Sequence, residues 1–293
     1  MSVELKKKSW KKVLIAALVL FAVFIGAYTY DIYSTMKEQK EYEELQKQMV
    51  AARAPRLDEV LSKNFVAHNG EQVLMPSEFF RDTNEIWAEN AGVDVSNPID
   101  FKQLQELNQD LYAWIRITDT NIDYPIAQHA EQDDFYLNHN IYGEPQFSGS
   151  IYSEAMNKKD FSDPVTVLYG HNMRNGTMFQ NLHLFENKDF FDTNPYVYVY
   201  TPDGTLIYEI VSAGVTDNRH ILYAYDFSDE DVFAEYLKNM KENPDEDVHV
   251  RDSVELTIDS HILIMSTCVG NNPAERYIVQ AVKVYDGRKT ENR

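Results

Sequence analysis

The chain has 293 residues, with 47 acidic and 27 basic side chains, a net charge of −20 and 44% hydrophobic residues. This length leaves room for one sizeable domain together with an anchor and a helical extension. Residues 1–12 hold five lysines and one glutamate, so 22 basic and 46 acidic side chains remain in the rest of the chain. Such an acidic surface is expected to repel nucleic acid and anionic lipid headgroups, and no nucleic-acid partner is predicted. Neutral or cationic partners, such as peptides and amines, are favoured.

The N-terminal segment has the pattern of a membrane anchor. After the basic tail at 1–12, an uncharged apolar stretch runs over 13–30 and ends before Asp31. Because about 20 apolar residues cross a bilayer, this stretch predicts one membrane-spanning helix of near-minimal length. The stretch exceeds a secretory signal core, and Gly26-Ala27-Tyr28 is a weak cleavage site, so we expect an uncleaved signal anchor. The lysines predict a cytoplasmic N-terminus, a single pass through the cell membrane, and an extracellular domain.

A stalk is predicted between the anchor and the main domain. From residue 31 to about 64, charged residues alternate with apolar ones and Pro55 interrupts the pattern, which indicates two helices. Another helix is expected near 77–90. We therefore assign 31–84 to a helical stalk with N-terminal helices, and 85–293 to the main domain.

From Trp114 onward the pattern changes to short apolar, β-branched and aromatic runs, which predict an antiparallel barrel or sandwich. The predicted strands are 113–117, 122–127, 150–153, 165–169, 196–200, 205–215, 253–258, 261–267 and 276–285. Pro202-Asp203-Gly204 predicts a hairpin between two of them. Residues 228–231 have the composition of a helix start. The helix that follows has an apolar face, which is expected to pack on the barrel and is formed by Val232, Phe233, Tyr236, Leu237 and Met240.

The only cysteine of the chain, Cys268, lies where an apolar run gives way to a polar loop. A structural cysteine would more naturally lie inside the run, whereas one at its end can meet solvent and substrate. An extracellular domain with a single cysteine cannot form an internal disulfide, and its free thiol risks oxidation. We therefore predict that Cys268 is a nucleophile. The alternative is a buried, inert thiol in a non-enzymatic surface module.

A cysteine nucleophile needs a base and a group that stabilises an oxyanion. His171 follows the strand predicted at 165–169 and opens the next loop, so it can reach the same barrel rim as Cys268. Arg276 begins the strand after Cys268, and its guanidinium suits an oxyanion. An exposed arginine beside Glu275 is the alternative for Arg276. His261 begins the cysteine strand but lies about 20 Å from the sulfur. The remaining histidines are expected on the solvated surface, namely His68, His129, His139, His183, His220 and His249.

At these residues the chain resembles the sortases. Ile264-Met265-Ser266-Thr267-Cys268, followed by Arg276, is similar to the sortase active-site signature, with Met265 in place of the commoner leucine. The histidine segment at 169–173, with 176–179 after it, resembles that of class B sortases. Segments 135–138 and 149–152, the helix from Ser228 and the N-terminal helices are also similar to that class, and the resemblance covers roughly 85–286.

The resemblance implies a mainly β fold, a closed barrel of about eight strands with N-terminal helices and one helix inserted between late strands. It implies a membrane-anchored cysteine transpeptidase, with Cys268 attacking the carbonyl after the threonine of an NPxT-type C-terminal sorting motif. His171 would act as acid and base, and Arg276 would hold the carbonyl oxygen. The residues that would line the peptide groove are Ser266, Thr267, Leu137 and Tyr223.

The implied partners are surface proteins that carry sorting signals, and an acceptor amine from a peptidoglycan precursor. A pilin lysine, as used by pilin-polymerising sortases, is the alternative acceptor. A hydrolytic cysteine peptidase would use the same cysteine and histidine, but papain-like enzymes place cysteine before histidine in the chain, the reverse of this order. No metal-ligand spacing is present in the sequence, and no cofactor is expected.

Overall fold

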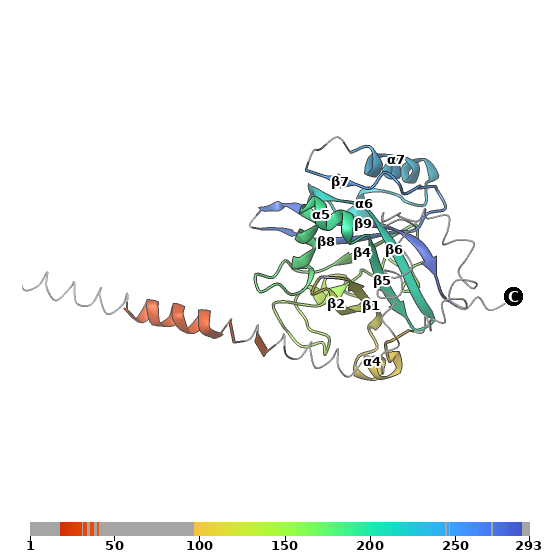
Figure 1. Ribbon diagram of the computed structural model, residues 1–293. Helices are drawn as coiled ribbons and strands as arrows, with labels where there is room; N and C mark the ends of the chain where they lie inside the picture. Colours follow the sequence, from red (N-terminus) through yellow and green to blue (C-terminus); the bar gives the residue numbers. More distant parts are fainter. Residues whose placement is uncertain are drawn as a thin grey trace, which may run out of the picture. The chain divides into compact units, whose positions relative to one another are not determined.

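The computed structural model describes residues 18–30, 32–33, 36–37, 40, 97–243, 245, 247–270 and 272–288. The chain divides into two compact units, Met1–Leu45 and Gln46–Arg293. In the first unit, residues 18–30 form an exposed helix (Figure 1). Within the described residues, no helix has both the length and the apolar character that a membrane span requires. Residues 13–17 of the predicted anchor lie outside the described residues, as do most of the predicted stalk and its helix at 77–90.

The second unit is built on one nine-stranded sheet with the order β5-β1-β2-β3-β4-β8-β9-β6-β7. Because β5 also pairs with β6, eight strands close into a barrel, and β7 extends the sheet beyond β6 (Figure 1). The strands are β1 (Leu111–Ile117), β2 (Asp123–Ala127), β3 (Ile151–Tyr152), β4 (Val165–Tyr169), β5 (Tyr196–Thr201), β6 (Gly204–Asp217), β7 (His249–Val250), β8 (Ile262–Val269) and β9 (Asn272–Asp286). The mainly β, closed-barrel fold predicted from the sequence is confirmed.

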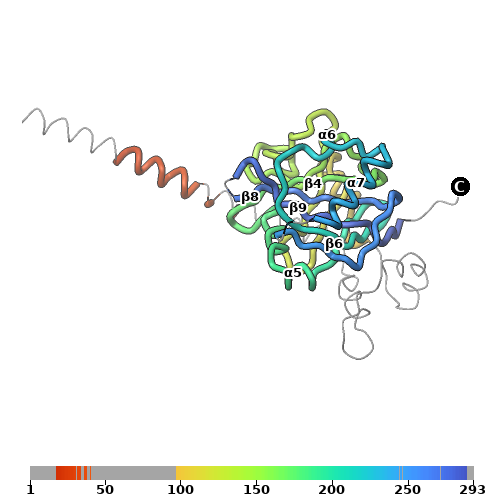
Figure 2. Tube along the Cα trace, turned by 90° about the horizontal axis from the view of Figure 1, so that it is seen from above, coloured from red at the N-terminus to blue at the C-terminus, as the bar shows by residue number. Residues whose placement is uncertain are grey.

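Short helices connect the strands, and one longer helix covers the barrel. They are α4 (Phe101–Leu107), η2 (Phe135–Leu137), η3 (Phe179–Glu186), α5 (Lys188–Thr193), α6 (Ile221–Ala224) and α7 (Glu230–Lys241). The helix α7 begins at its N-cap Asp229, whose carboxylate accepts from the backbone N–H groups of Asp231 and Val232. As its apolar pattern predicts, α7 buries Phe233, Leu237 and Met240. Its position on the outside of the β6–β9 part of the barrel is visible in Figure 2.

The predicted strand positions are mostly correct, but the expected antiparallel architecture is wrong in two places. The pairs β2–β3 and β4–β8 are parallel. The segment 253–258 is also not a strand: Val254 is buried, yet the backbone carbonyl of Val254 accepts from Lys241 Nζ at 2.9 Å rather than from a neighbouring strand. An apolar residue in an extended loop produces the same short pattern as a strand, which explains the error.

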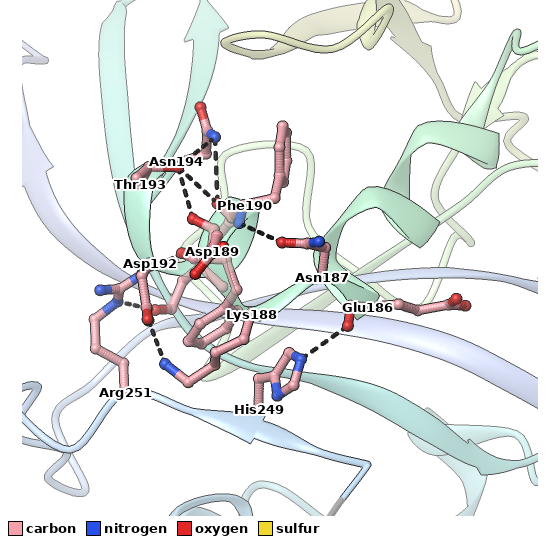
Figure 3. Close-up of polar contacts among 12 residues, drawn as sticks. Glu186, Asn187, Lys188, Asp189, Phe190, Asp192, Thr193, Asn194, His249 and Arg251 are labelled. Atoms are coloured by element: carbon pink, nitrogen blue, oxygen red, sulfur yellow. Dashed lines mark hydrogen bonds and ion pairs between the residues drawn. The ribbon is translucent and has the colours of Figure 1, made fainter.

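The two-residue strand β7, which the sequence pattern did not predict, fixes the α5 end of the barrel. Arg251, next to β7, is buried and donates through Nη2 to the carbonyl of Phe191 at 2.6 Å. His249 Nε2 lies 2.9 Å from the carbonyl oxygen of Glu186, the last residue of η3. Asn187 caps α5 by accepting from the N–H of Phe190 at 3.0 Å. Figure 3 shows these contacts side by side, so the end of η3 is tied to β7.

Candidate active site

The parallel pairing of β4 with β8 brings the segments of His171 and Cys268 to one edge of the barrel. Tyr169 is the register partner of Ser266, and the two candidate residues each follow two positions later. The pairing continues past the strand end, since Gly170 N donates to Ser266 O at 3.2 Å and Thr267 Oγ1 donates to Gly170 O at 2.8 Å. Neighbouring strands lie about 5 Å apart, so the backbones of the two candidate residues are adjacent.

Arg276 is the cross-strand partner of Cys268 in the β8–β9 hairpin. The register shifts directly after Cys268, between it and Val269, where the hairpin turns. The guanidinium of Arg276 makes local bonds: Nη1 donates to the carbonyls of Pro273 at 3.2 Å and Glu275 at 2.8 Å. The thiol of Cys268 is free and partly exposed. The pairing therefore brings all three predicted catalytic residues to the same end of the barrel.

The imidazole of His171 is held by a backbone carbonyl. Its Nε2 lies 2.7 Å from Leu137 O, and because a carbonyl only accepts, the tautomer in this contact carries its proton on Nε2. Gly149 allows the backbone to approach this carbonyl, since a Cβ there would lie 2.4 Å from Leu137 O. The ring also stacks on the exposed Phe147, with centroids 5.5 Å apart. The orientation of His171 is therefore set by η2 and the loop before β3.

The four predicted groove residues have different environments. Leu137 and Tyr223 expose 38% and 69% of their surface, so both are accessible to a bound peptide. Ser266 and Thr267 are buried. Side chains alternate along a strand, so Ser266 lies on the same face of β8 as Cys268, and Thr267 lies on the opposite face.

Next to the thiol, a row of aromatic rings connects β3 and β4 to α6. Tyr152 stacks on Tyr169 at 5.4 Å between centroids, Tyr169 lies 6.2 Å from the ring of His220, and His220 lies 4.3 Å from that of Tyr223. Burial raises the pKa of Tyr152, and the nearby Cys268 contributes in the same direction. This row gives the barrel edge an apolar, aromatic wall.

A buried carboxylate lies beneath this aromatic row. Glu154 is 8% exposed, and His220 Nε2 lies 2.8 Å from its carboxylate oxygens. Burial raises the pKa of Glu154, and the bond to His220 opposes that increase. The prediction that His220 is a solvated surface residue is wrong, because its imidazole contacts the buried carboxylate of Glu154. A buried carboxylate needs such a donor or cation beside it. The pair holds the start of α6, and with it Tyr223, on the barrel.

Two side chains that the sequence pattern did not indicate contact the backbone of Cys268. Asn172 Nδ2 donates to Cys268 O at 2.8 Å, and His183 Nε2 lies 3.0 Å from the same oxygen. His183 was expected on the solvated surface, but its side chain is 15% exposed. The sequence signal that could have indicated Asn172 is its position directly after His171, because a third polar group often orients a nucleophile and its base.

Within the described residues, no group of three or more His, Cys, Asp or Glu side chains could hold a metal ion.

Comparison with known proteins agrees with this geometry. The sequence profile of the sortase domain family matches residues 115–284. The chain is 34% identical over 171 residues to sortase B of Listeria monocytogenes, which covers 58% of this chain and 67% of the relative. Sortase B of Staphylococcus aureus is 26% identical over 168 residues, or 57% of this chain and 67% of that one. The crystal structure of Clostridium perfringens sortase B superimposes with a TM-score of 0.57 at 34% identity, covering 63% of this chain and 99% of that one.

A closed β-barrel with a cysteine and a histidine at adjacent strand ends, matched by this profile, defines a cysteine transpeptidase of the sortase type. The chain belongs to the sortase family, and its similarity to the sortase B proteins places it in class B.

Proposed function

We propose that this enzyme cleaves a C-terminal NPxT-type sorting motif after its threonine and transfers the new acyl group to an amine, with Cys268, His171 and Arg276 as catalytic residues. The observation that supports this assignment best is the register of β8. On one side of β8, Cys268 pairs with Arg276 of β9. On the other side, the pairing of Ser266 with Tyr169 of β4 aligns Cys268 with the segment of His171.

In the first half of the proposed reaction, Cys268 Sγ bonds to the threonyl carbonyl carbon while its proton passes to His171. The C–N bond of the peptide breaks, and His171 returns the proton to the departing amine, which leaves a thioester. In the second half, an acceptor amine loses a proton to His171 and attacks the thioester carbon. The C–S bond breaks, and Cys268 regains a proton as the new amide forms.

Arg276 is proposed to stabilise the oxyanion that forms in both halves. Its fixed charge and multiple donors suit this role. In the structure its Nη1 donates to the carbonyls of Pro273 and Glu275, so the guanidinium would exchange these bonds for the substrate oxygen. His171 would likewise exchange its contact with Leu137 O for a contact with the leaving amine.

We further propose that the substrates are surface proteins with sorting signals and that the acceptor is a peptidoglycan-precursor amine. The exposed Leu137 and Tyr223, with the aromatic row that leads to Tyr223, would bind the peptide as an extended chain. The basic tail at 1–12 and the apolar stretch at 13–30 support membrane tethering with the barrel outside the cell. Tethering both enzyme and substrate to one surface would raise their effective concentration.

The test is a transpeptidation assay on the domain at 85–293, with an Asn-Pro-x-Thr peptide and either a peptidoglycan-type or a lysine-containing acceptor. Mass spectrometry of the products distinguishes an amine adduct, which a transpeptidase forms, from the free acid that a peptidase releases. Cys268→Ala and His171→Ala should abolish the adduct and keep the native melting temperature. Adduct formation that persists in either variant contradicts the proposal. So does a free acid as the sole product of the wild-type enzyme with both acceptors.

A further inference from the structure

The main-chain carbonyl of Cys268 is the meeting point of three segments. Its oxygen lies 2.8 Å from Asn172 Nδ2 and 3.0 Å from His183 Nε2, and those two nitrogens are 3.0 Å apart. Asn172 directly follows His171 in the loop after β4, and His183 lies on η3. One side-chain bond, between residues 96 apart in sequence, thus connects the strand of the candidate nucleophile with the loop of the candidate base.

Neutral His183 supports the bond from Asn172 to Cys268 O. Glu186 Oε1 lies 2.6 Å from His183 Nδ1, so the carboxylate accepts a hydrogen bond from that nitrogen. In neutral His183, Nε2 then accepts the second N–H of Asn172; in charged His183, Nε2 donates to Cys268 O. In the neutral state the imidazole therefore keeps the amide nitrogen of Asn172, rather than its oxygen, facing the carbonyl of Cys268.

His183 is itself held from two sides. The ring of Tyr277, the residue after Arg276 on β9, lies 4.8 Å from the imidazole. Glu186 is fixed through its backbone by His249 of β7, and Figure 3 shows its side chain directed away from that contact. One support of His183 therefore comes from β9, and the other comes from Glu186 of its own element η3, which β7 holds in place. The orientation of Asn172 is thus set by residues outside its own loop.

From this arrangement, and on the basis of the proposed function, we infer that Asn172 is a positioning residue of the transfer reaction, oriented by His183. Its carboxamide fixes the end of β8 relative to the loop of His171, and so sets the separation of sulfur and imidazole. A displacement of about 1 Å between reacting groups can lower turnover about 100-fold. Loss of this bond should therefore reduce kcat by about 10- to 100-fold, with KM within about twofold of the wild type, because neither Asn172 nor His183 belongs to the proposed peptide groove.

A carbonyl label tests the bond without relying on activity. Since the chain has one cysteine, protein grown with [1-¹³C]cysteine gives a single labelled carbonyl, that of Cys268. A hydrogen bond deshields a carbonyl carbon, so Asn172→Ala should move this resonance upfield. Asn175→Ala is the matched control, because Asn175 lies exposed in the same loop and bonds to Thr177. An Asn172→Ala resonance that stays at the wild-type position overturns the inference.

Kinetics then separate a positioning role from a purely structural one. His183→Gln offers a carboxamide that can accept from Asn172 or donate to Cys268 O, so it should retain most of kcat, whereas His183→Leu should lose it. Equal losses in both, or an upfield shift in Asn172→Ala with an unchanged kcat, contradict the inference. All variants should melt near the wild-type temperature; if Asn172→Ala does not fold, the His183 pair decides.

Failure of the proposed function is distinguishable from failure of this inference. If the wild-type enzyme forms no amine adduct, the proposed transfer reaction is wrong. The carbonyl resonance and the rate of iodoacetamide alkylation of Cys268 then decide the inference. Both should change in Asn172→Ala and stay unchanged in Asn175→Ala, and the absence of a difference between these variants overturns it.

Discussion

The residue before the candidate base, Gly170, has no room for a side chain. A Cβ at this position would lie 2.5 Å from Ile151 Cδ1 and 2.8 Å from Phe179 Cγ. Ile151 and Phe179 are 1% and 0% exposed, so neither can move into solvent. Overpacking of this kind costs about 1–3 kcal/mol. At roughly 2–4 °C per kcal/mol for a domain of this size, Gly170→Ala should lower the melting temperature by about 2–12 °C.

Thermal unfolding followed by circular dichroism measures this effect, with Gly143→Asn as the control. A Cβ at Gly143 would meet no atom within 4 Å, and Asn tolerates its φ of +75°. Ile151→Val removes the Cδ1 atom that the new Cβ would strike, so the double variant should lose less stability than the sum of the two single losses. Strict additivity, or an unchanged melting temperature in Gly170→Ala, would refute this reasoning.

Three further predictions concern the barrel. Burial raises the pKa of Glu209 to about 7 from its ordinary 4.5, although Arg251 opposes the increase, so the folded protein binds more protons than the unfolded chain between these values. The stability contributed by Glu209 therefore falls as pH rises from 4.5 to 7. Glu209→Gln should remove this contribution to the pH dependence of the free energy of unfolding, measured by urea unfolding. Asp229→Ala should cost about 1 kcal/mol in the same assay, because α7 loses its N-cap; a loss equal to that of exposed Asp203→Ala contradicts this. Gln280→Leu should cost about 1–3 kcal/mol, since the Tyr236 hydroxyl loses its acceptor at 2.6 Å, and a neutral effect contradicts it.

Local sequence patterns predicted the strands well because short runs of apolar, β-branched and aromatic residues favour a strand. The run at 165–169 coincides with β4, and Pro202-Asp203-Gly204 forms the β5–β6 turn, where Gly204 has a φ of +153°. The positions of Cys268 and His171 at strand ends also followed from these runs. Their catalytic roles, and that of Arg276, stay predictions.

Pairing partners could not be predicted in the same way. Burial on both faces is typical of parallel strands, but nothing within β4 or β8 identifies the other as its neighbour, because their separation in sequence is large. His183 illustrates the same limit at the site. Its polar neighbours suggested an exposed histidine, but the segment packs as η3 against β8 and β9, and that contact is non-local.

The most direct test of the central claim is the intact mass of the protein during turnover of an Asn-Pro-x-Thr peptide without an acceptor amine. We expect a transient adduct with the mass of the N-terminal peptide fragment, located on Cys268 by fragmentation, released by hydroxylamine and absent in Cys268→Ala. Peptide cleavage without an adduct on Cys268, or an adduct that survives in Cys268→Ala, would contradict it.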